Sequence, residues 1–337
     1  MIKECIKKAS ERNDLSRAEI KEAFDEIMQG RATGAQIAAL LAIMKMKGET
    51  SEEITGAAES MRSVAAEVSP KVREELLDVV GTGGDCKNTF NISTCAAIVA
   101  AASGCRVAKH GNRAVSSGCG AADVLEKLGV NINAGNKKNA ELIEKIGIAF
   151  MFAPMHHPAM KYAAGPRKEM GIRTIFNILG PLTNPAKAQT ILLGVFDGAL
   201  AEKLADALKG LGIKKALVVH GRDGSDEISI SGSTIVFEVG GEIKKYEIKP
   251  EDFGIKRFPI EEIKVNSPDE AAGAIRAVLS GTDKGAKRNI VLLNAGAAIY
   301  ANGKAGSIKE GIILAREAID SGKAMKKLDE LIKAGNA

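Results

Sequence analysis

Residues 76–113 read LLDVVGTGGDCKNTFNISTCAAIVAAASGCRVAKHGNR, and this stretch decides the fold. The apolar run 76–80 predicts a short buried strand, the Ala-rich run 91–102 predicts a helix, and residues 105–108 predict a second strand. Each predicted strand leads into a loop that contains glycine. A strand, a helix and a strand in this order are typical of an α/β protein, in which ligands bind beyond the carboxyl ends of the strands.

The two loops, GTGGD at 81–85 and KHGNR at 109–113, have the composition of a phosphate site. Glycine lets the backbone approach a ligand closely, and the free N–H groups of a helix's first turn attract anions. Hydroxyl and cationic side chains stand nearby in the sequence: Thr89, Ser93, Thr94, Lys109 and Arg113. Neither G-x-x-x-x-G-K-[ST] nor a helix-opening G-x-G-x-x-G is present, which argues against a P-loop ATPase and a nicotinamide dehydrogenase. The stretch therefore predicts a site for a polyphosphate or a phosphosugar.

Length and composition narrow the class of protein. The chain has 337 residues, 45% of them hydrophobic, and a formal net charge of +5. This length allows a large core and more than one domain. The basic residues are dispersed among 42 acidic ones, which suits small anionic substrates and predicts no nucleic-acid partner. No apolar window of about 20 residues predicts a membrane span.

The cysteines and the N-terminus predict a cytoplasmic protein. The five cysteines are odd in number and none has the C-x-x-C spacing, which favours free thiols in a reducing compartment over a zinc site. Residues 1–5 carry mixed charge and no apolar signal region follows them, so secretion is not expected.

The first 68 residues predict a separate helical unit. Ser16 opens a capping box before a helix that stops at Gly30, and Thr33 opens a second helix that ends at Gly48. Thr50 opens a third helix, expected to run to about Val68. The second of these helices is apolar nearly all round, so we expect it to be buried in a core or in a subunit interface.

Beyond residue 72, strands and helices alternate, which predicts a sheet covered on both faces. Further buried strands are expected at 148–153, 190–196, 215–220 and 289–294, with a hairpin at 234–248. Helices are expected at 198–211 and 269–279.

Several motifs, in order and at their spacing, resemble the anthranilate phosphoribosyltransferase family over essentially the whole chain. They are GTGGD (81–85), NIST (91–94), KHGNRAVSS (109–117), the segment HHPAM (156–160) through Arg167 to GIRTIFN (171–177), GPLTNP (180–185), and DEIS (226–229). The resemblance implies a small helical domain, residues 1–70, to which the chain returns near 167–186. It also implies a large α/β domain, residues 71–337, with a central sheet flanked by helices, and a homodimer joined through the helical domain.

The resemblance also implies a reaction. The amine of anthranilate displaces pyrophosphate from 5-phospho-α-D-ribose 1-diphosphate (PRPP), a step of tryptophan biosynthesis. An arylamine is already nucleophilic, so positioning and electrostatic stabilisation of the leaving group should dominate. No general base is assigned, although Lys109 is a possible catalytic residue. Magnesium, with two ions per site, is implied as the cofactor.

The residues follow from the matched motifs. Those that match PRPP-binding positions are Gly81, Gly84, Asp85, Thr89, Asn91, Ile92, Ser93, Thr94, Lys109, His110, Gly111, Asn112, Arg113, Ala114, Val115, Ser116, Ser117 and Ala121. Those that match the anthranilate side are Gly81, Asn112 and Arg167, and a guanidinium suits a carboxylate because it can bind it bidentately. Ser93, Asp226 and Glu227 match metal ligands.

Some points stay open at this level. Cys86 stands where the family usually has Gly, and Ala121 replaces a phosphate-binding Ser, and both departures bear on substrate affinity more than on the reaction class. For His110 and His157, an acid–base role and a packing role are both open. A pyrimidine nucleoside phosphorylase of the same architecture is the first alternative, and the Arg167 region argues against it. A non-catalytic nucleic-acid-binding relative is the second, and an aromatic content of 4% without Trp leaves it no stacking platform.

Overall fold

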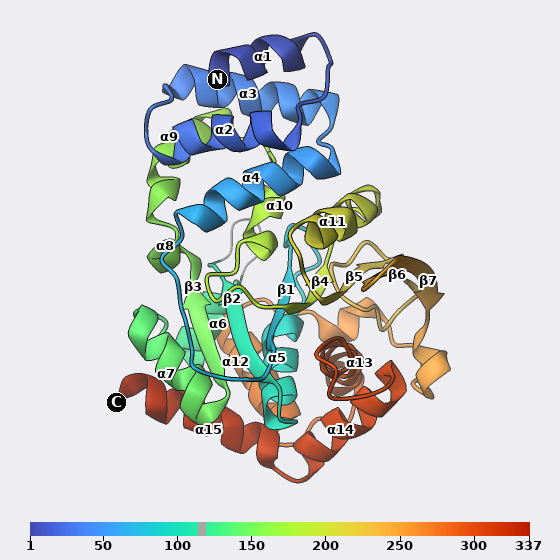
Figure 1. Cartoon of the computed structure of the whole chain (residues 1–337). Helices are drawn as coiled ribbons and strands as arrows, with labels where there is room; N and C mark the ends of the chain where they lie inside the picture. Colours follow the sequence, from blue (N-terminus) through green and yellow to red (C-terminus); the bar gives the residue numbers. More distant parts are fainter. Residues whose placement is uncertain (114–118) are drawn as a thin grey trace.

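The computed structural model describes residues 1–113 and 119–337, and it shows a helical unit above a sheet with helices on both faces (Figure 1). Of the residues expected to bind PRPP, Ala114, Val115, Ser116 and Ser117 lie outside the described residues. In the described part of the chain, no helix is long and apolar enough to cross a membrane.

The sheet has seven strands in the order β3-β2-β1-β4-β5-β6-β7. The strands are β1 (Leu76–Gly81), β2 (Arg106–Gly111), β3 (Ile148–Phe152), β4 (Thr190–Gly194), β5 (Lys215–Gly221), β6 (Thr234–Val239) and β7 (Ile243–Ile248). β1 to β5 pair in parallel, whereas β6 and β7 form an antiparallel hairpin at one edge. The carboxyl ends of β1, β2, β4 and β5 therefore lie along one edge of the sheet.

Alternate residues of the central strands face two separate cores. In β4, Ile191 and Leu193 pack with the helical unit, while Leu192 packs with the helices on the opposite face. β5 follows the same rule, with Val218 on the first side and Leu217 on the second. This period of two is the pattern of a sheet buried on both faces.

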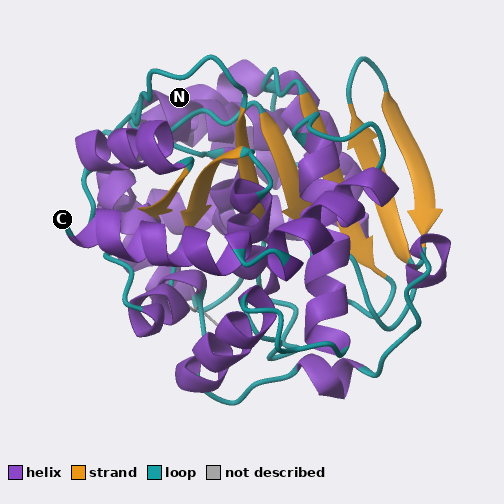
Figure 2. Cartoon of the chain, turned by 90° about the horizontal axis from the view of Figure 1, so that it is seen from below, coloured by secondary structure: helices purple, strands orange, loops and turns teal. Residues whose placement is uncertain are grey.

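The lower face is covered by α5, by α6 and by helices from the second half of the chain (Figure 2). The helices here are α5 (Ile92–Ala102), α6 (Ala121–Leu128), α12 (Pro268–Leu279), α13 (Ala286–Ala301), α14 (Ile308–Asp320) and α15 (Lys323–Asn336), while α7 (Asn136–Ile146) packs beside β3. The strand predicted at 289–294 is wrong, because these residues lie inside α13. α13 is buried on nearly all sides, and a helix of this kind has the same continuous apolar run as a buried strand.

The upper face is covered by the helical unit and by α11 (Gly198–Gly210) of the α/β unit. The helical unit consists of α1 (Ile2–Ser10), α2 (Arg17–Met28), α3 (Gly34–Lys47) and α4 (Ser51–Ser63). The capping boxes at Ser16, Thr33 and Thr50 are confirmed. α4 ends at Ser63, earlier than expected. The sequence patterns did not predict α1, although Ile2, Cys5 and Ala9 form its buried face.

The chain crosses between the two units more than once. After α8 (Ala153–His156), α9 (Lys161–Met170) packs against α2 and α3, and α10 (Phe176–Leu179) contacts α4 before the chain enters β4. Backbone hydrogen bonds join the first crossing to the second, from Ala66 N to His156 O at 2.8 Å and from Val68 N to Pro185 O at 3.0 Å.

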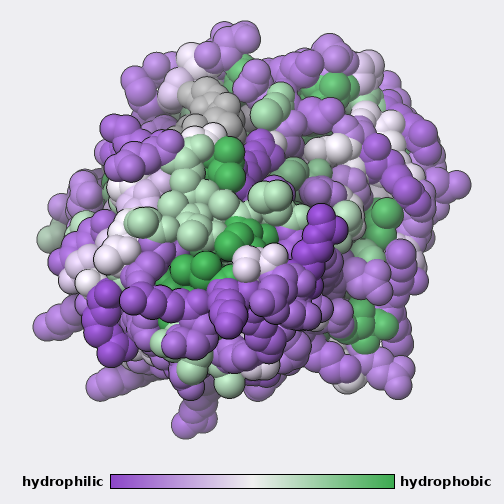
Figure 3. Space-filling view, turned by 90° about the horizontal axis from the view of Figure 1, so that it is seen from above, coloured by the Kyte–Doolittle hydropathy of each residue, from purple (hydrophilic) through white to green (hydrophobic). Residues whose placement is uncertain are grey.

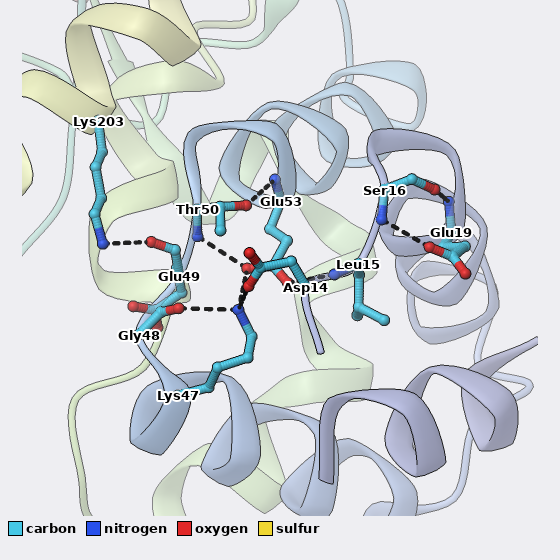
Figure 4. Close-up of polar contacts among 10 residues, drawn as sticks. All are labelled: Asp14, Leu15, Ser16, Glu19, Lys47, Gly48, Glu49, Thr50, Glu53 and Lys203. Atoms are coloured by element: carbon cyan, nitrogen blue, oxygen red, sulfur yellow. Dashed lines mark hydrogen bonds and ion pairs between the residues drawn. The ribbon is translucent and has the colours of Figure 1, made fainter. Parts of the chain in front are cut away.

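A buried ion pair fixes the helical unit at the junction of α3 and α4 (Figure 4). The Glu53 carboxylate is fully buried, and it accepts hydrogen bonds from Leu15 N at 2.9 Å, Thr50 N at 2.9 Å and Lys47 Nζ at 3.0 Å. Lys203 of α11 donates to Glu49 O at 2.7 Å, which ties this corner to the α/β unit. The buried carboxylate at this corner thus has its partners within the chain.

Candidate active site

The site is built at the carboxyl ends of β1, β4 and β5. Gly81 at the end of β1 pairs with Gly194 at the end of β4, and Thr82 N donates to Gly194 O at 2.9 Å. A Cβ on either glycine would collide with Asp226, on Gly81 with its carboxylate and on Gly194 with its backbone carbonyl. These two glycines therefore make room for Asp226 between the strand ends.

Asp226 and Glu227 stand at the centre of this arrangement, in the loop that follows β5. Gly83 N donates to Asp226 Oδ2 at 2.7 Å, so the carboxylate is bound to the loop 81–85. Ser93 N, in the first turn of α5, donates to Glu227 Oε1 at 3.1 Å. The two carboxylates thus join the glycine loop to the N-terminus of α5.

The electrostatics of these carboxylates are unfavourable within the chain alone. Burial raises the pKa of Asp226, and the neighbouring Asp85 raises it further. Burial followed by the charge of Asp226 holds the pKa of Glu227 well above its ordinary value. Burial also raises the pKa of Asp85. In the described residues no lysine, arginine or histidine forms an ion pair with Asp226 or Glu227, so the cluster lacks a countercharge in contact with it.

Lys109, in the second half of β2, brings a positive charge close to Glu227. Its side chain is buried, and Nζ donates to Val79 O at 2.6 Å and to Ser93 Oγ at 3.4 Å. Burial lowers the pKa of Lys109, whereas Asp78 and Glu227 raise it. Lys109 is therefore held against the cluster without pairing directly with either carboxylate.

The donor set fits magnesium. Carboxylates and a hydroxyl are oxygen ligands of the kind that Mg²⁺ prefers, and it is usually held by one or two carboxylates plus substrate phosphates. In the described residues no group of three or more His, Cys, Asp or Glu side chains is arranged to hold a metal by itself. The crowded carboxylates, with their raised pKa values, would be stabilised by a divalent cation. Ser93, Asp226 and Glu227 are thus suited to an ion whose remaining ligands come from substrate or water.

Asp78 and the histidines form a second buried layer below the loops. Asp78 Oδ1 accepts from His110 N at 3.2 Å, and Asp78 Oδ2 accepts from Asn184 Nδ2 at 2.7 Å. His110 Nδ1 lies 3.2 Å from Gly180 O, and its ring stands 5.0 Å from that of His157. Burial lowers the pKa of both histidines, to about 4 for His157, so both rings are neutral at pH 7. The Nε2 atom of each is buried without a partner in the described structure.

The start of α5 supplies hydroxyl and amide groups with different roles. Asn91 is bound to Cys119, through Nδ2 to its carbonyl at 3.2 Å and through Oδ1 from its thiol at 3.3 Å. The Thr94 hydroxyl is buried without a hydrogen-bond partner in the described structure, and Ile92 is a core residue. Thr89 forms a β-bridge with Lys264. Among these described residues, Ser93 is the one that contacts the carboxylate cluster.

The two departures from the family pattern have structural counterparts. Cys86 adopts a φ of 57°, in the left-handed region that glycine occupies without strain, which explains the family's usual Gly. Ala121 begins α6, and its Cβ packs close to Gly111.

Arg113 is engaged elsewhere. Its guanidinium pairs with Glu126 through both Nη atoms and with Asp123 at 2.8 Å, and it lies 5.5 Å from the Phe152 ring centroid. Asn112 Oδ1 accepts from Arg113 N at 2.8 Å, and neither side chain contacts the carboxylate cluster in the described structure.

Arg167 lies on α9, with its guanidinium 5.0 Å from the centroid of the Phe176 ring. Burial lowers its pKa, and in the described structure it has no carboxylate or hydrogen-bonded partner. A guanidinium that is partly buried on an aromatic ring and lacks an anion is suited to bind an aromatic carboxylate.

The sequence motifs assigned no role to Asp78 or to Arg173. Asp78 reads as part of an apolar strand, and its burial beside His110 and Asn184 arises only from the pairing of β1 with β2. Arg173 donates from Nη2 to Gly84 O at 2.7 Å. A lone arginine in a loop gives no signal of such a contact.

Two cavities of the described structure lie away from these groups. One, of about 540 Å³, is lined by Arg17, Glu59, Arg62 and Lys187, and the other, of about 250 Å³, by residues between Glu67 and Leu76 and by 186–189. The candidate site lies outside both cavities, at the carboxyl ends of β1, β4 and β5.

Comparison with known proteins agrees with this architecture. The family described as "Glycosyl transferase family, a/b domain" matches residues 73–325, and "Glycosyl transferase family, helical bundle domain" matches residues 3–65. A chain with both domains belongs to this two-domain class of glycosyltransferases.

Individual relatives narrow this class to one enzyme family. Anthranilate phosphoribosyltransferase of Acetivibrio thermocellus is 53% identical over 338 residues, covering 100% of this chain and 97% of that protein. The crystal structure of anthranilate phosphoribosyltransferase from Thermus thermophilus has a TM-score of 0.94 at 44% identity, covering 99% of each chain. The Saccharomyces cerevisiae enzyme in complex with PRPP and Mg has a TM-score of 0.90 at 30% identity, covering 99% of this chain and 98% of that one. The chain belongs to the anthranilate phosphoribosyltransferase family, which confirms the resemblance in its motifs and its fold class.

Proposed function

We propose that the protein transfers the phosphoribosyl group of PRPP to the amine of anthranilate, which releases pyrophosphate and forms N-(5-phosphoribosyl)anthranilate for tryptophan biosynthesis. Full-length similarity to enzymes of this name supports the reaction. The observation that carries the site is the pair Asp226 and Glu227, bound to the glycine loop and to the first turn of α5 without a paired cation in the described structure.

The chain's own residues are suited to position PRPP. The N–H groups of Gly83 and Ser93 donate to Asp226 and Glu227, and the positive end of the α5 helix dipole favours an anion bound beside them. Lys109 adds a positive charge that is fixed in place by its hydrogen bond to Val79 O. Preorganised charge of this kind stabilises a leaving group without reorganisation, which is the main requirement when the nucleophile is already an amine.

Magnesium would be held by Ser93, Asp226 and Glu227, and we propose two ions per site. Bound Mg²⁺ supplies positive charge to the departing pyrophosphate. The S. cerevisiae relative was solved with PRPP and Mg, which supports this use of the metal. Asp85, Asp226 and Glu227 lie close enough to affect one another's pKa, and when all three are ionised their negative charge exceeds that of one divalent ion.

The aromatic substrate is assigned to Gly81, Asn112 and Arg167. Arg167 would bind the anthranilate carboxylate, because its guanidinium has no anion partner in the described structure and lies on Phe176. The remaining PRPP-binding assignments, from Gly84 to Ala121, are proposed on the matched motifs. The histidines are proposed as neutral packing and hydrogen-bonding residues, since burial keeps both uncharged at pH 7.

Assembly through the helical unit completes the proposal. We place the domain boundary near residue 70. α3 buries only Ile37, Leu40, Leu41 and Met44 inside the chain, while Met46 is 87% exposed. Figure 3 shows an apolar area on this end of the molecule. An apolar helix face that the chain itself leaves uncovered supports a homodimer. All five cysteines are free, which supports a reducing, cytoplasmic location.

A fluorescence assay tests the function. Anthranilate fluorescence should fall only when PRPP and Mg²⁺ are both present, and EDTA should stop the decrease. Constant fluorescence with both substrates and magnesium would remove the proposal, and phosphorolysis of a pyrimidine nucleoside by the same preparation would favour the alternative activity.

A further inference from the structure

Arg173 reaches the phosphate loop from the part of the chain that carries Arg167. Gly171, with a φ of 62°, ends α9, and the following residues lead to α10. α9 packs on α2 and α3, so this segment is anchored on the helical unit. The Arg173 side chain nevertheless ends at the loop 81–85 of the α/β unit, where Nη2 donates to Gly84 O at 2.7 Å.

The contact between Arg173 and Gly84 depends on the residues on both sides of the guanidinium. Gly84 has a φ of 83°, and a Cβ there would meet the Arg173 guanidinium at 2.9 Å, so the guanidinium lies directly on the glycine backbone. The Arg173 guanidinium also stacks on Phe196, with 4.6 Å between the guanidinium carbon and the ring centroid. A stacked, planar guanidinium has a fixed orientation, unlike a lysine ammonium.

Phe196 is itself bound to the same loop, because its backbone N donates to Thr82 Oγ1 at 3.2 Å. The loop is thereby held from β4 through Thr82 and from the α9–α10 segment through Gly84. Any movement of the helical unit relative to the sheet must displace Arg173 from Gly84 or carry the loop with it.

The charge of Arg173 is not neutralised by the described part of the chain. Arg113 pairs with Asp123 and Glu126, but in the described structure Arg173 has no carboxylate partner. A guanidinium has five donors, and one strong hydrogen bond to Gly84 O leaves most of them available. A positive charge with unused donors beside a phosphate loop favours a bound diphosphate.

We propose that Arg173 is a positioning residue that holds the 81–85 loop for PRPP and couples it to the Arg167 segment, so that each substrate changes the affinity for the other. This inference rests on the proposed function, because it assumes that Arg167 and the loop serve two substrates of one reaction. Coupling between two sites is reciprocal and commonly amounts to about 5–150-fold in affinity.

The test compares Arg173→Met with Arg173→Lys and with a matched control. Arg276→Met is the control, since Arg276 also donates one Nη2 hydrogen bond to a backbone carbonyl, that of Leu128, outside the site. Calorimetry gives the Kd of anthranilate with and without saturating Mg·pyrophosphate, a probe that cannot react. Steady-state assays give the KM for PRPP.

We expect Mg·pyrophosphate to change the anthranilate Kd by roughly fivefold or more in the wild type and in Arg276→Met. In Arg173→Met this change should fall below about twofold, while the Kd of anthranilate alone stays the same and the KM for PRPP rises about tenfold. Arg173→Lys should restore only part of the coupling because it cannot stack in the same fixed plane. Phe196→Leu removes the ring on which the Arg173 guanidinium stacks but keeps the guanidinium. Its change in anthranilate Kd on addition of Mg·pyrophosphate should lie between those of the wild type and Arg173→Met.

Unchanged coupling in Arg173→Met and Phe196→Leu, or no coupling in the wild type, overturns the inference. If Arg173→Met fails to fold, Phe196→Leu alone decides it. Failure of the proposed function is distinct, because the wild type would then consume no anthranilate with PRPP and Mg²⁺.

Discussion

Two groups of acidic side chains in this molecule, one around Glu53 and one around Asp226 and Glu227, differ in the partners that the chain gives them. Glu53, in the helical unit, takes two backbone N–H groups and the ammonium of Lys47 (Figure 4). Asp226 and Glu227, at the strand ends, take amide hydrogen bonds from Gly83 and Ser93 but no ion pair within the described residues, and burial raises the pKa of both. A carboxylate that has both hydrogen bonds and an ion pair within the chain, as Glu53 has, stabilises the fold. Carboxylates that lack a countercharge are poised for a ligand that brings one.

The largest expected effect is on stability, at Glu53. Glu53→Ala leaves Lys47 buried without its partner, and breaking a buried pair typically costs about 3–5 kcal/mol. Chemical denaturation should show this loss, while kcat of the remaining folded enzyme stays near wild type. Asp14→Ala is the control, because Asp14 is the exposed partner of Lys47 and should cost less than about 1 kcal/mol. Equal losses of unfolding free energy in Glu53→Ala and Asp14→Ala would contradict a special role for the buried pair.

The next effect is on turnover, at Lys109. Lys109→Met removes the fixed charge beside Ser93 and Glu227, and loss of one preorganised electrostatic group typically lowers kcat about 10²–10³-fold. Lys47→Met, which removes the cation of the other cluster, should lower stability and leave kcat nearly unchanged. Steady-state assays and unfolding curves of both variants check this, and a similar fall in kcat for both would show that the two clusters are not different in kind.

A smaller effect separates the two substrates. Arg167→Ala should raise the KM for anthranilate with little change for PRPP, since a hydrogen bond to a charged group contributes about 1.5–3 kcal/mol. Arg167→Lys should recover part of the affinity. Equal rises in both KM values would make Arg167 a structural residue.

The smallest effect is a pH dependence at Asp78. Burial raises its pKa from 3.8 to about 6, so the folded state binds the proton more tightly than the unfolded state. Its contribution therefore favours folding at low pH and is lost as pH rises from about 4 to about 6, with a slope of at most ~1.4 kcal/mol per pH unit. Asp78→Asn should remove this contribution from the free energy of unfolding measured across that range. The same slope in both proteins would assign it to other carboxylates.

The sequence predicted much of the fold because its signals were local. The capping boxes at Ser16, Thr33 and Thr50 mark helix starts, and the glycines at 240–241 mark the hairpin between β6 and β7. The prediction of a strand at 289–294 was wrong because an apolar run does not distinguish a buried helix from a buried strand. α4 ends before Val68 because residues 64–70 leave the helical unit to cross towards the sheet.

The proximity of Lys109, Asp226 and Glu227 was predictable, because each stands in a motif near the end of a strand. Contacts between distant segments were not predictable. The pairing of Arg113 with Glu126 on α6, the burial of Asp78 against Asn184, and the reach of Arg173 to Gly84 depend on how the elements pack. A single sequence carries no local signal for such contacts.

The most direct test of the account removes both unpaired charges at once while keeping the shape of the side chains. In the double variant Asp226→Asn, Glu227→Gln, turnover at saturating Mg²⁺ should fall by roughly 10³-fold or more. Its melting temperature at pH 7 should stay equal to that of the wild type or rise, because two carboxylates with raised pKa values oppose folding there. Near wild-type turnover in a folded double variant, at any magnesium concentration, would contradict the claim that these carboxylates are held for the reaction.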